Sequence, residues 1–222
     1  LFVTGTDTGV GKTLVACALV RRLREHGFRA AGMKPVASGC DRTPDGLRNE
    51  DALALQRESS GEWPYATINP YAFEPAIAPH VAAAEAAVQV DFGTIAAGYR
   101  QLAAGSDRVV VEGAGGWLVP LAGRATIADL AAHLGLDVVL VVGLRLGCLN
   151  HAFLTADAIA ARGLRLAGWV ANAIDPAYER WQANLETLDA RLPAPRLGLV
   201  PHLPPGDVTA AARALDLAPL LR

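Results

Sequence analysis

Short apolar runs alternate with longer amphipathic segments along this chain. The apolar runs are rich in Val, Leu, Ala and Gly and have the length of buried strands; they comprise residues 1–4, 28–34, 108–112, 137–142, 166–171 and 196–200. Between them, apolar positions recur with a helical period, which predicts helices over residues 12–26, 50–59, 91–104, 126–134, 150–162 and 177–191. This alternation predicts an α/β fold, a mostly parallel sheet of about seven strands with helices on both faces.

Ligands of such sheets bind at the carboxyl ends of the strands, so the segments that follow the strands matter most for function. The longest of them covers residues 39–79 and is richer in Pro, Asn, Ser and charged residues than the rest of the chain. We therefore expect this excursion to carry function rather than to link domains.

The composition is that of an intracellular enzyme. With 222 residues, 52% of them hydrophobic, the chain can bury a full core, and we expect a single domain over residues 1–222. Its net charge of −2 gives no electrostatic reason to bind nucleic acid. Cys17, Cys40 and Cys148 are odd in number and far apart, which excludes a disulfide framework or a metal knuckle and favours the reducing cytoplasm.

We expect no association with a membrane. The longest apolar stretch, around residues 138–142, is far too short to cross a bilayer, and no basic-then-apolar leader precedes the first strand. Because the sequence begins at Leu1, we expect a few residues to precede it.

The first predicted strand runs directly into Gly-Thr-Asp-Thr-Gly-Val-Gly-Lys-Thr, residues 5–13, which opens the first helix. Glycines let backbone N–H groups turn inward around phosphate oxygens, and the helix start adds its positive dipole end. In a phosphate loop, Lys12 reaches the β- and γ-phosphates and the Thr13 hydroxyl ligates Mg²⁺. The motif predicts a P-loop NTPase-type fold. Thr6 stands where the usual spacing has glycine, and a glycine-rich turn without a ligand is the alternative.

Lysine is scarce in this chain. Lys12 and Lys34 are its two lysines, beside eighteen arginines. A lysine ammonium is a compact charge that fits among phosphate oxygens, whereas arginine is a broad fork. The scarcity therefore favours chemical roles for both lysines over two incidental surface positions.

Two carboxylates are candidates for holding a metal ion. Glu112 ends a buried apolar strand and is followed by the small residues 113–116, the position where phosphate-loop enzymes place a second Mg²⁺ contact. A carboxylate that caps the next segment is the alternative for Glu112. Asp51 stands at the start of a predicted helix, so on the residues alone a structural role, as a helix cap or first-turn acid, is as well supported as metal binding.

Several motifs together resemble the dethiobiotin synthetase family. They occur in the order of that family, span nearly the whole chain and include an extended phosphate loop, which is itself a family trait. The motifs are Gly5–Thr13, Lys34-Pro-Val-Ala-Ser-Gly39, Asn69-Pro-Tyr71, Pro79-His80, Val111-Glu-Gly-Ala-Gly-Gly116, Gly147-Cys-Leu-Asn-His151 and Gly168-Trp-Val-Ala-Asn172.

The resemblance implies an ATP-dependent cyclo-ligase of biotin biosynthesis. Its substrate, 7,8-diaminononanoate, captures CO₂ as a carbamate, the γ-phosphoryl group of MgATP activates the carbamate as a mixed anhydride, and the second amine closes the ureido ring. Carried over by position, Thr13, Asp51 and Glu112 hold Mg²⁺, while Lys12 and Lys34 flank the carbamate and the transferred phosphoryl group. Thr8 and Ser38 bind the diamine substrate.

The resemblance also assigns the nucleotide contacts. They are Gly9, Val10, Gly11, Lys12, Thr13, Leu14, Asp51, Glu112, Gly113, Ala114, Gly115, Asn172, Ala173, Pro201, His202 and Leu203. The match is weaker around the base, where Ala173 and Val208 replace acidic residues of the family. Gly9 occupies a position that is often acidic in relatives. These departures affect selectivity for the base and contacts to the diamine rather than a catalytic group.

The aliphatic substrate ends in a carboxylate. Gly147, Cys148, Leu149 and Asn150 follow a buried strand and open a helix, whose free N–H groups form an anion site. In the family this loop receives the carboxylate of a substrate bound mainly by the partner subunit, which implies a homodimer. An Asn150 that simply caps the helix is the compatible alternative. We assign no catalytic role to His80 or His151.

Two other classes share parts of this pattern. A switch ATPase of the chromosome-partitioning type carries an extra lysine early in the loop, and here only Lys12 is present. A GTPase needs Asn-Lys-x-Asp after a late strand, and residues 172–175 have that spacing without the lysine. Nucleotide hydrolysis that requires both a diamine and bicarbonate distinguishes the ligase from both classes.

Overall fold

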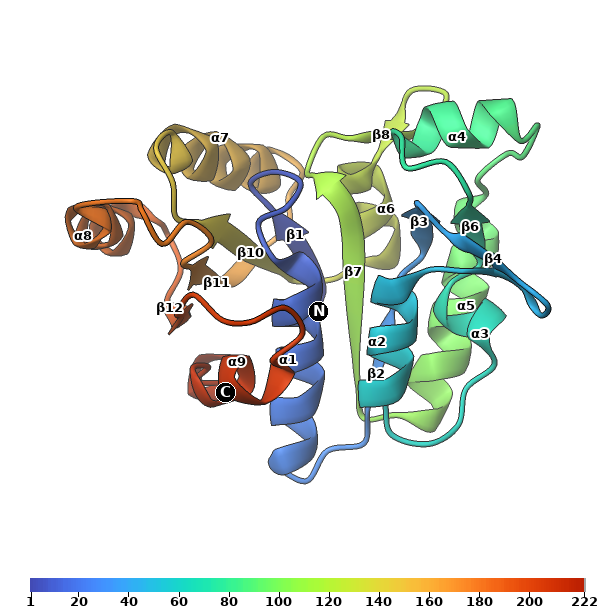
Figure 1. The fold of residues 1–222 in the computed structure, drawn as a ribbon, viewed down its shortest axis with the longest axis horizontal. Helices are drawn as coiled ribbons and strands as arrows, with labels where there is room; N and C mark the ends of the chain where they lie inside the picture. Colours follow the sequence, from blue (N-terminus) through green and yellow to red (C-terminus); the bar gives the residue numbers. More distant parts are fainter. Residues whose placement is uncertain (222) are drawn as a thin grey trace.

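The computed structural model describes residues 1–221. Its centre is a parallel sheet of six strands in the order β12-β11-β10-β1-β7-β2 (Figure 1). These strands are β1 Phe2–Gly5, β2 Ala30–Met33, β7 Arg108–Gly116, β10 Val138–Gly143, β11 Leu166–Asn172 and β12 Arg196–Val200. All six coincide with the predicted apolar runs. The α/β class and the parallel sheet are therefore confirmed, with one strand fewer in the sheet than expected.

The predicted helices are also present. They are α1 Lys12–Glu25, α2 Glu50–Glu58, α5 Phe92–Gly105, α6 Ile127–Leu134, α7 Cys148–Ala161 and α8 Trp181–Arg191. The largest boundary error is at α8, which begins four residues late because residues 173–180 form loop and turns around Asp175, whose carboxylate accepts from the N–H of Ala177 at 2.9 Å. Additional short helices are α3 Tyr65–Ile68, α4 Pro79–Glu85, α9 Val208–Arg213 and a 3₁₀ turn at Ala218–Leu220. None of them is longer than seven residues, which is too short to display a helical period.

The excursion over residues 39–79 is structured by short local pairings that the periodicity did not predict. β4 Asp41–Thr43 and β5 Gly46–Arg48 form a hairpin, while β3 Val36–Ser38 pairs in parallel with β6 Tyr71–Phe73. A further small pair, β8 Pro120–Ala122 with β9 Ala125–Thr126, follows β7. Each strand has three residues or fewer, so the alternation is too short to recognise in the sequence.

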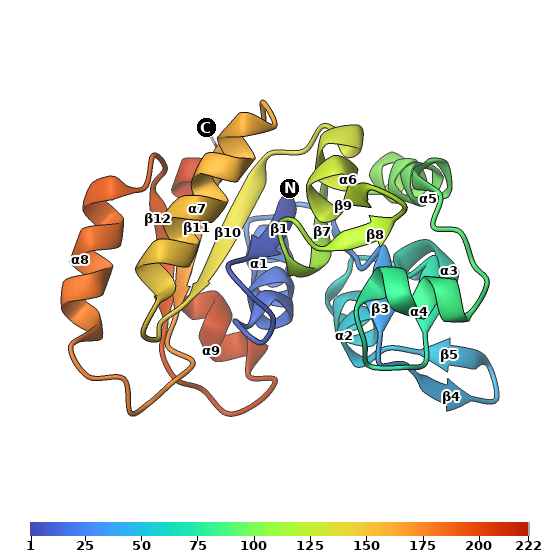
Figure 2. The ribbon, with the colours of Figure 1, turned by 90° about the horizontal axis from the view of Figure 1, so that it is seen from above.

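Helices cover both faces of the sheet (Figure 2). In β7, Val110 faces the apolar cluster formed with α1, α2 and α9, whereas Val109 and Val111 face the cluster formed with α5 and α6. Farther along the second face, Leu140 and Val142 of β10 pack with α7 and α8. Each strand is apolar on both sides, which explains why the runs show no polar alternation.

The sheet order places the functional segments beside one another. β1 lies between β7 and β10, and β2 lies next to β7, so the carboxyl ends of these strands meet at the start of α1. Gly11 precedes α1 with φ of +87°, and a Cβ there would lie 2.1 Å from Nδ2 of Asn172. A glycine is therefore required both by the backbone conformation and by the close approach of β11.

Candidate functional site

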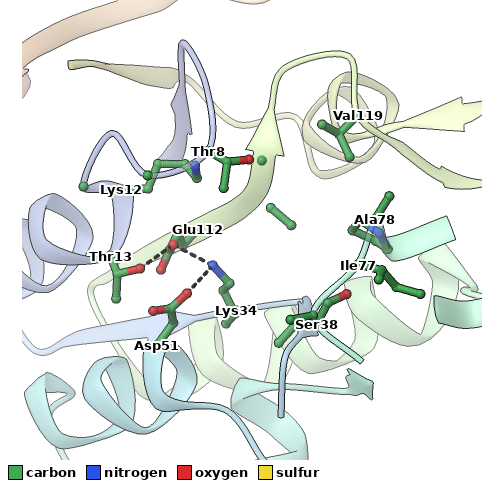
Figure 3. A pocket seen from close by; sticks show the side chains of 17 residues that line it. Thr8, Lys12, Thr13, Lys34, Ser38, Asp51, Ile77, Ala78, Glu112 and Val119 are labelled. Atoms are coloured by element: carbon green, nitrogen blue, oxygen red, sulfur yellow. Dashed lines mark hydrogen bonds and ion pairs between the residues drawn. The ribbon is translucent and has the colours of Figure 1, made fainter. Parts of the chain in front are cut away.

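A cleft of about 700 Å³ opens at the carboxyl ends of β1, β2 and β7 (Figure 3). Its walls come from the loop between β1 and α1, the segments after β2 and β7, the start of α2 and the chain that leads into α4. The predicted site residues among its lining are Thr8, Gly9, Gly11, Lys12, Thr13, Lys34, Ser38, Asp51, Glu112, Ala114 and Gly115. The fold thus brings together most of the predicted catalytic, metal and phosphate contacts.

The phosphate loop is held in shape by its own polar contacts. Nζ of Lys12 donates to the backbone oxygen of Asp7 at 2.9 Å, and Nδ2 of Asn172 donates to the backbone oxygen of Val10 at 2.9 Å. Asn172 therefore clamps the loop, a role that the resemblance did not assign to it. Burial of the Lys12 ammonium, aided by repulsion from Lys34, lowers the pKa of Lys12 to about 8.

Lys34 lies between two carboxylates. Its ammonium donates to Oε1 of Glu112 at 2.6 Å, to Oδ2 of Asp51 at 3.0 Å and to the backbone oxygen of Gly113 at 3.3 Å (Figure 3). Burial opposes its charge, but the two carboxylates outweigh this and raise the pKa of Lys34. This cluster joins the end of β2 to α2 and β7.

Glu112 is the most deeply buried member of this cluster, with a side chain only 1% exposed. Burial raises the pKa of Glu112, and the Lys34 ammonium opposes that shift. Its Oε1 also accepts from Oγ1 of Thr13 at 2.8 Å, whereas Oε2 is buried without a hydrogen-bond partner in residues 1–221. β7 continues through Gly116, so the alternative in which Glu112 caps a following segment is wrong.

Asp51 is not the helix cap. Asn49 caps α2, since its side chain accepts from the N–H of Ala52 at 3.2 Å, and Asp51 is the second residue of the helix. The Asp51 carboxylate instead faces Lys34, whose ammonium overcomes the effect of burial and holds the pKa of Asp51 below its ordinary value. Asn49, two residues before Asp51, was the signal in the sequence that a different residue caps the helix.

Within the described chain, no three His, Cys, Asp or Glu side chains form a cluster that could hold a metal ion by themselves. The predicted metal ligands are two carboxylates and one hydroxyl, from Asp51, Glu112 and Thr13, and they converge on one side of the cleft (Figure 3). Ser38 lines the same cleft, and its Oγ is buried with no partner among residues 1–221.

The residues predicted around the nucleotide base do not line this cleft. A second cavity of about 490 Å³ adjoins it, because Thr13 and Asp51 border both; Leu14, Arg57, Gly206 and Val208 line its far part. Val208 thus lies near the start of α1. Arg57 also lines this cavity, and the sequence analysis did not predict it as a site residue.

Ala173, Pro201 and His202 border a different cavity, of about 310 Å³, together with Leu144 and Tyr178. Nδ1 of His202 lies 3.2 Å from the backbone oxygen of Ala173, so the ends of β11 and β12 are joined there. Leu203, in contrast, packs on the apolar cluster that also contacts Leu14 and Val208. The predicted base contacts are therefore divided between the two sides of the sheet.

The start of α7 lies outside the cleft. Gly147 precedes the helix with φ of +93°, and no side chain of the described residues caps it, so the alternative in which Asn150 is the cap is wrong. The N–H groups of Cys148 and His151 donate to the backbone oxygens of Arg145 and Gly147, which leaves those of Leu149 and Asn150 at the helix end.

Arg145 has a role that the sequence analysis did not predict. Its guanidinium forms an ion pair with Asp7 of the phosphate loop and so connects that loop to the one before α7. The side chains that complete the cleft were also missed; they are Ala37, Ala76, Ile77, Ala78, Pro79 and Val119. They are small or apolar and carry no chemical signal of their own, although Ala37 and Pro79 lie within motifs of the resemblance.

Comparisons with known proteins identify the family of this chain. A family model described as an AAA domain matches residues 1–209. The chain is 56% identical to the ATP-dependent dethiobiotin synthetase BioD of Pseudomonas paraeruginosa, over 99% of this chain and 96% of the relative. It is 55% identical to the protein of the same name from Xylella fastidiosa, over 96% of this chain and 95% of the relative.

Solved structures of other proteins share the fold. The MinC:MinD cell division protein complex of Aquifex aeolicus aligns with a TM-score of 0.58 at 16% identity, over 96% of this chain and 85% of that chain. The septum site-determining protein MinD of Pyrococcus horikoshii, complexed with Mg-ADP, aligns with a TM-score of 0.53 at 15% identity, over 96% and 86% of the two chains. Likeness at this identity shows the fold alone. In the described residues, no helix is both long enough and apolar enough to cross a membrane.

The lowered pKa of Lys12 predicts that its buried positive charge destabilises the folded protein. At pH 7 the charged ammonium is buried, so Lys12→Met should raise the free energy of unfolding of the nucleotide-free protein by about 1–3 kcal/mol. Above pH 8 the folded protein loses this proton while the unfolded chain keeps it up to about pH 10.5. The advantage of the variant should therefore shrink as the pH rises through this window.

Urea unfolding at pH 7 and pH 10 measures this difference. The matched control is Lys34→Met, the same exchange at the other lysine, which should destabilise the protein because it leaves two carboxylates without their cation. A Lys12→Met variant that is less stable than the natural protein at both pH values would contradict the prediction.

Proposed function

The chain belongs to the ATP-dependent dethiobiotin synthetase family, and we propose that its cleft converts 7,8-diaminononanoate, CO₂ and ATP into dethiobiotin, ADP and phosphate. The observation that carries this proposal is the single cleft in which a phosphate loop, two lysines and two carboxylates converge. Such a combination suits phosphoryl transfer to an anionic acceptor, because it offers cations for the oxygens and carboxylates for a metal.

The reaction requires three steps. One substrate amine adds to CO₂ and gives a carbamate, whose oxygen then attacks the γ-phosphorus and releases ADP. The second amine attacks the carbonyl carbon of the resulting carbamic-phosphoric anhydride, which expels phosphate and closes the ureido ring. Negative charge develops on carbamate and phosphoryl oxygens in these steps, and Lys12 and Lys34 are the ammonium groups of the cleft that stabilise it.

Mg²⁺ fits the predicted ligands Thr13, Asp51 and Glu112. The fit rests on the unpartnered Oε2 of Glu112, a buried oxygen that a cation would satisfy, and on the hard oxygen character of all three groups. When bound, Mg²⁺ supplies charge neutralisation for the nucleotide phosphates. The three residues would hold it next to the phosphate loop, because Thr13 belongs both to that loop and to the predicted ligand set.

Substrate positioning falls to Thr8 and Ser38. Both line the cleft, Thr8 near Lys12 and Ser38 near Lys34 (Figure 3). The buried, unpartnered Oγ of Ser38 has a free capacity for hydrogen bonds that a substrate amine or carbamate would fill. The apolar lining at Ile77 and Val119 suits the aliphatic part of the diamine.

The nucleotide lies across the phosphate loop. Gly9 to Leu14 and Glu112 to Gly115 bind the phosphates, and we assign the nucleoside to the adjoining cavity beside Leu14 and Val208. Asn172, Ala173, Pro201, His202 and Leu203 stay predictions as base contacts. Of these, Asn172 already uses its amide to clamp the loop.

A homodimer would supply the carboxylate end of the substrate site at Gly147, Cys148, Leu149 and Asn150. Large apolar side chains are exposed beside this helix start: Leu146 is 89% and Leu154 is 60% exposed. Contact with a second copy would bury them, and an isolated chain leaves them in water.

The three cysteines are free and buried, which agrees with a reducing cytoplasm.

The product test is direct. Purified protein with MgATP, 7,8-diaminononanoate and labelled bicarbonate should yield labelled dethiobiotin in mass spectrometry, because the carbonyl carbon derives from CO₂. Without the diamine, ATP turnover should be negligible, since no acceptor is present. Equal ATP turnover without the diamine, or a ureido product without the label, would refute the proposed reaction.

Lys34 is expected to act through close contact rather than through charge alone. The guanidinium of Lys34→Arg is too broad for a buried site with contacts of 2.6 and 3.0 Å, so turnover should fall by about 10²-fold or more, nearly as far as in Lys34→Ala. Steady-state kinetics measures this, and circular dichroism verifies folding. The reverse exchange at an ion pair outside the cleft, Arg21→Lys beside Glu58, should leave turnover within about twofold. Near-normal turnover of Lys34→Arg would show that bulk charge suffices.

The helix start at Gly147 is expected to matter for the diamine only. Gly147→Gln should raise the KM for 7,8-diaminononanoate about tenfold by obstructing the anion site, with little change in the KM for ATP. Gly163→Gln is the control, because Gly163 follows the other end of α7, has φ of +72° and also has open space around it. Light scattering should give a dimer. A fully active monomer, or equal effects of the two variants, would contradict the shared site.

A further inference from the structure

We propose that the Lys34 ammonium is the built-in counter-cation of the metal carboxylates, so that it excludes a free divalent cation and yields only to a metal that arrives with the nucleotide. The proposal concerns the contacts of Lys34 with Asp51 and Glu112; it rests on the proposed function only where it says what the metal is for. It makes metal binding conditional on nucleotide binding through one side chain.

The geometry supports this role for Lys34. Its ammonium contacts Asp51 and Glu112 at 3.0 and 2.6 Å, and its side chain is only 6% exposed. Two carboxylates this close together, one of them wholly buried, are costly unless a cation compensates them. No other cation within residues 1–221 pairs with either carboxylate, since Lys12 donates instead to the backbone oxygen of Asp7.

The ligand set is too small to hold a bare metal ion against this competition. Mg²⁺ takes six oxygen ligands and loses its water reluctantly, and the chain offers two carboxylates and the Thr13 hydroxyl. A free ion would have to displace a well-paired ammonium in return for these few ligands. A metal bound to nucleotide phosphates brings oxygen ligands with it, and it gains the unpartnered Oε2 of Glu112, which Lys34 leaves unused.

The displaced ammonium can move toward the cleft, because Lys34 is one of the residues that line it. Lys34 lines the cleft between the carboxylates and the open space next to Ser38 (Figure 3). Apart from Asp51 and Glu112, it has the backbone oxygen of Gly113 at 3.3 Å as an acceptor, and the anionic oxygens of a bound nucleotide and carbamate would add to this. Arrival of the metal with the nucleotide would thus present Lys34 to the reacting groups, whereas the ion pairs with Asp51 and Glu112 hold it away from them.

The test is metal binding without nucleotide. Mn²⁺ is titrated into the nucleotide-free protein, and electron paramagnetic resonance measures the free ion. Lys34→Met should bind Mn²⁺ at least about tenfold more tightly than the natural protein, because the competing cation is gone. The matched control is Lys12→Met, which removes the same charge from the same cleft but breaks no contact to a carboxylate; its affinity should change less than about threefold.

Two further measurements locate the effect. Mn²⁺ should raise the Tm of Lys34→Met more than that of the natural protein, and Asp51→Asn in the Lys34→Met background should abolish the tighter binding. If Lys34→Met does not fold without metal, Lys34→Gln, whose amide still donates to a carboxylate, replaces it in the same titration.

Unchanged Mn²⁺ affinity in both Lys34 variants would overturn the proposal, as would an equal gain in Lys12→Met, which would assign the effect to the net charge of the cleft. Neither result depends on the diamine. Failure of this inference is therefore distinct from failure of the proposed reaction, which is judged by the labelled product.

Discussion

The structure of the site depends on one buried cation between two anions. Lys34 comes from the end of β2, Asp51 from the first turn of α2 and Glu112 from β7, so the ion cluster fixes three elements relative to one another. Such a cluster contributes little net stability, because desolvation cancels much of the Coulomb attraction. Its value is geometric. Loss of Lys34 would leave two neighbouring carboxylates without their cation, so the ammonium restrains both to a single arrangement beside the phosphate loop.

The main sheet was predictable because burial on both faces leaves a clear signal. The run at 138–142 has no polar residue to interrupt it, and it is a central strand, β10, with every side chain buried. The small pairings were not predictable. β3 and β6 have three residues each and depend on contacts that no local pattern records, such as Asn69, whose side-chain amide donates to the backbone oxygen of Lys34 at 2.6 Å.

The chemical part of the site was predictable for a different reason. Lys34 and Glu112 stand at the carboxyl ends of predicted strands, and the topology of a parallel sheet brings such positions together. Asp51 is a first-turn acid of α2, as one reading of the sequence had it, but the readings of Asp51 and Asn150 as helix caps are wrong, because helix caps are decided by backbone angles. Asn49 has the extended conformation of a cap, whereas α7 is preceded by Gly147 in the left-handed region, where no side chain of the described residues reaches the helix end. Arg145 escaped notice because an ion pair across 138 residues leaves no mark in either segment.

The pairing of Arg145 with Asp7 bears on the entropy of nucleotide binding. Asp7 is held from outside by this arginine, and the loop is held from inside by Asn172, which donates to Val10. The loop therefore has its shape before any ligand arrives, and only the contact from Lys12 to the backbone of Asp7 must break when phosphate enters. Ordering of the backbone has already occurred during folding, so phosphate meets a preorganised template, and little of its binding free energy is lost to loop closure.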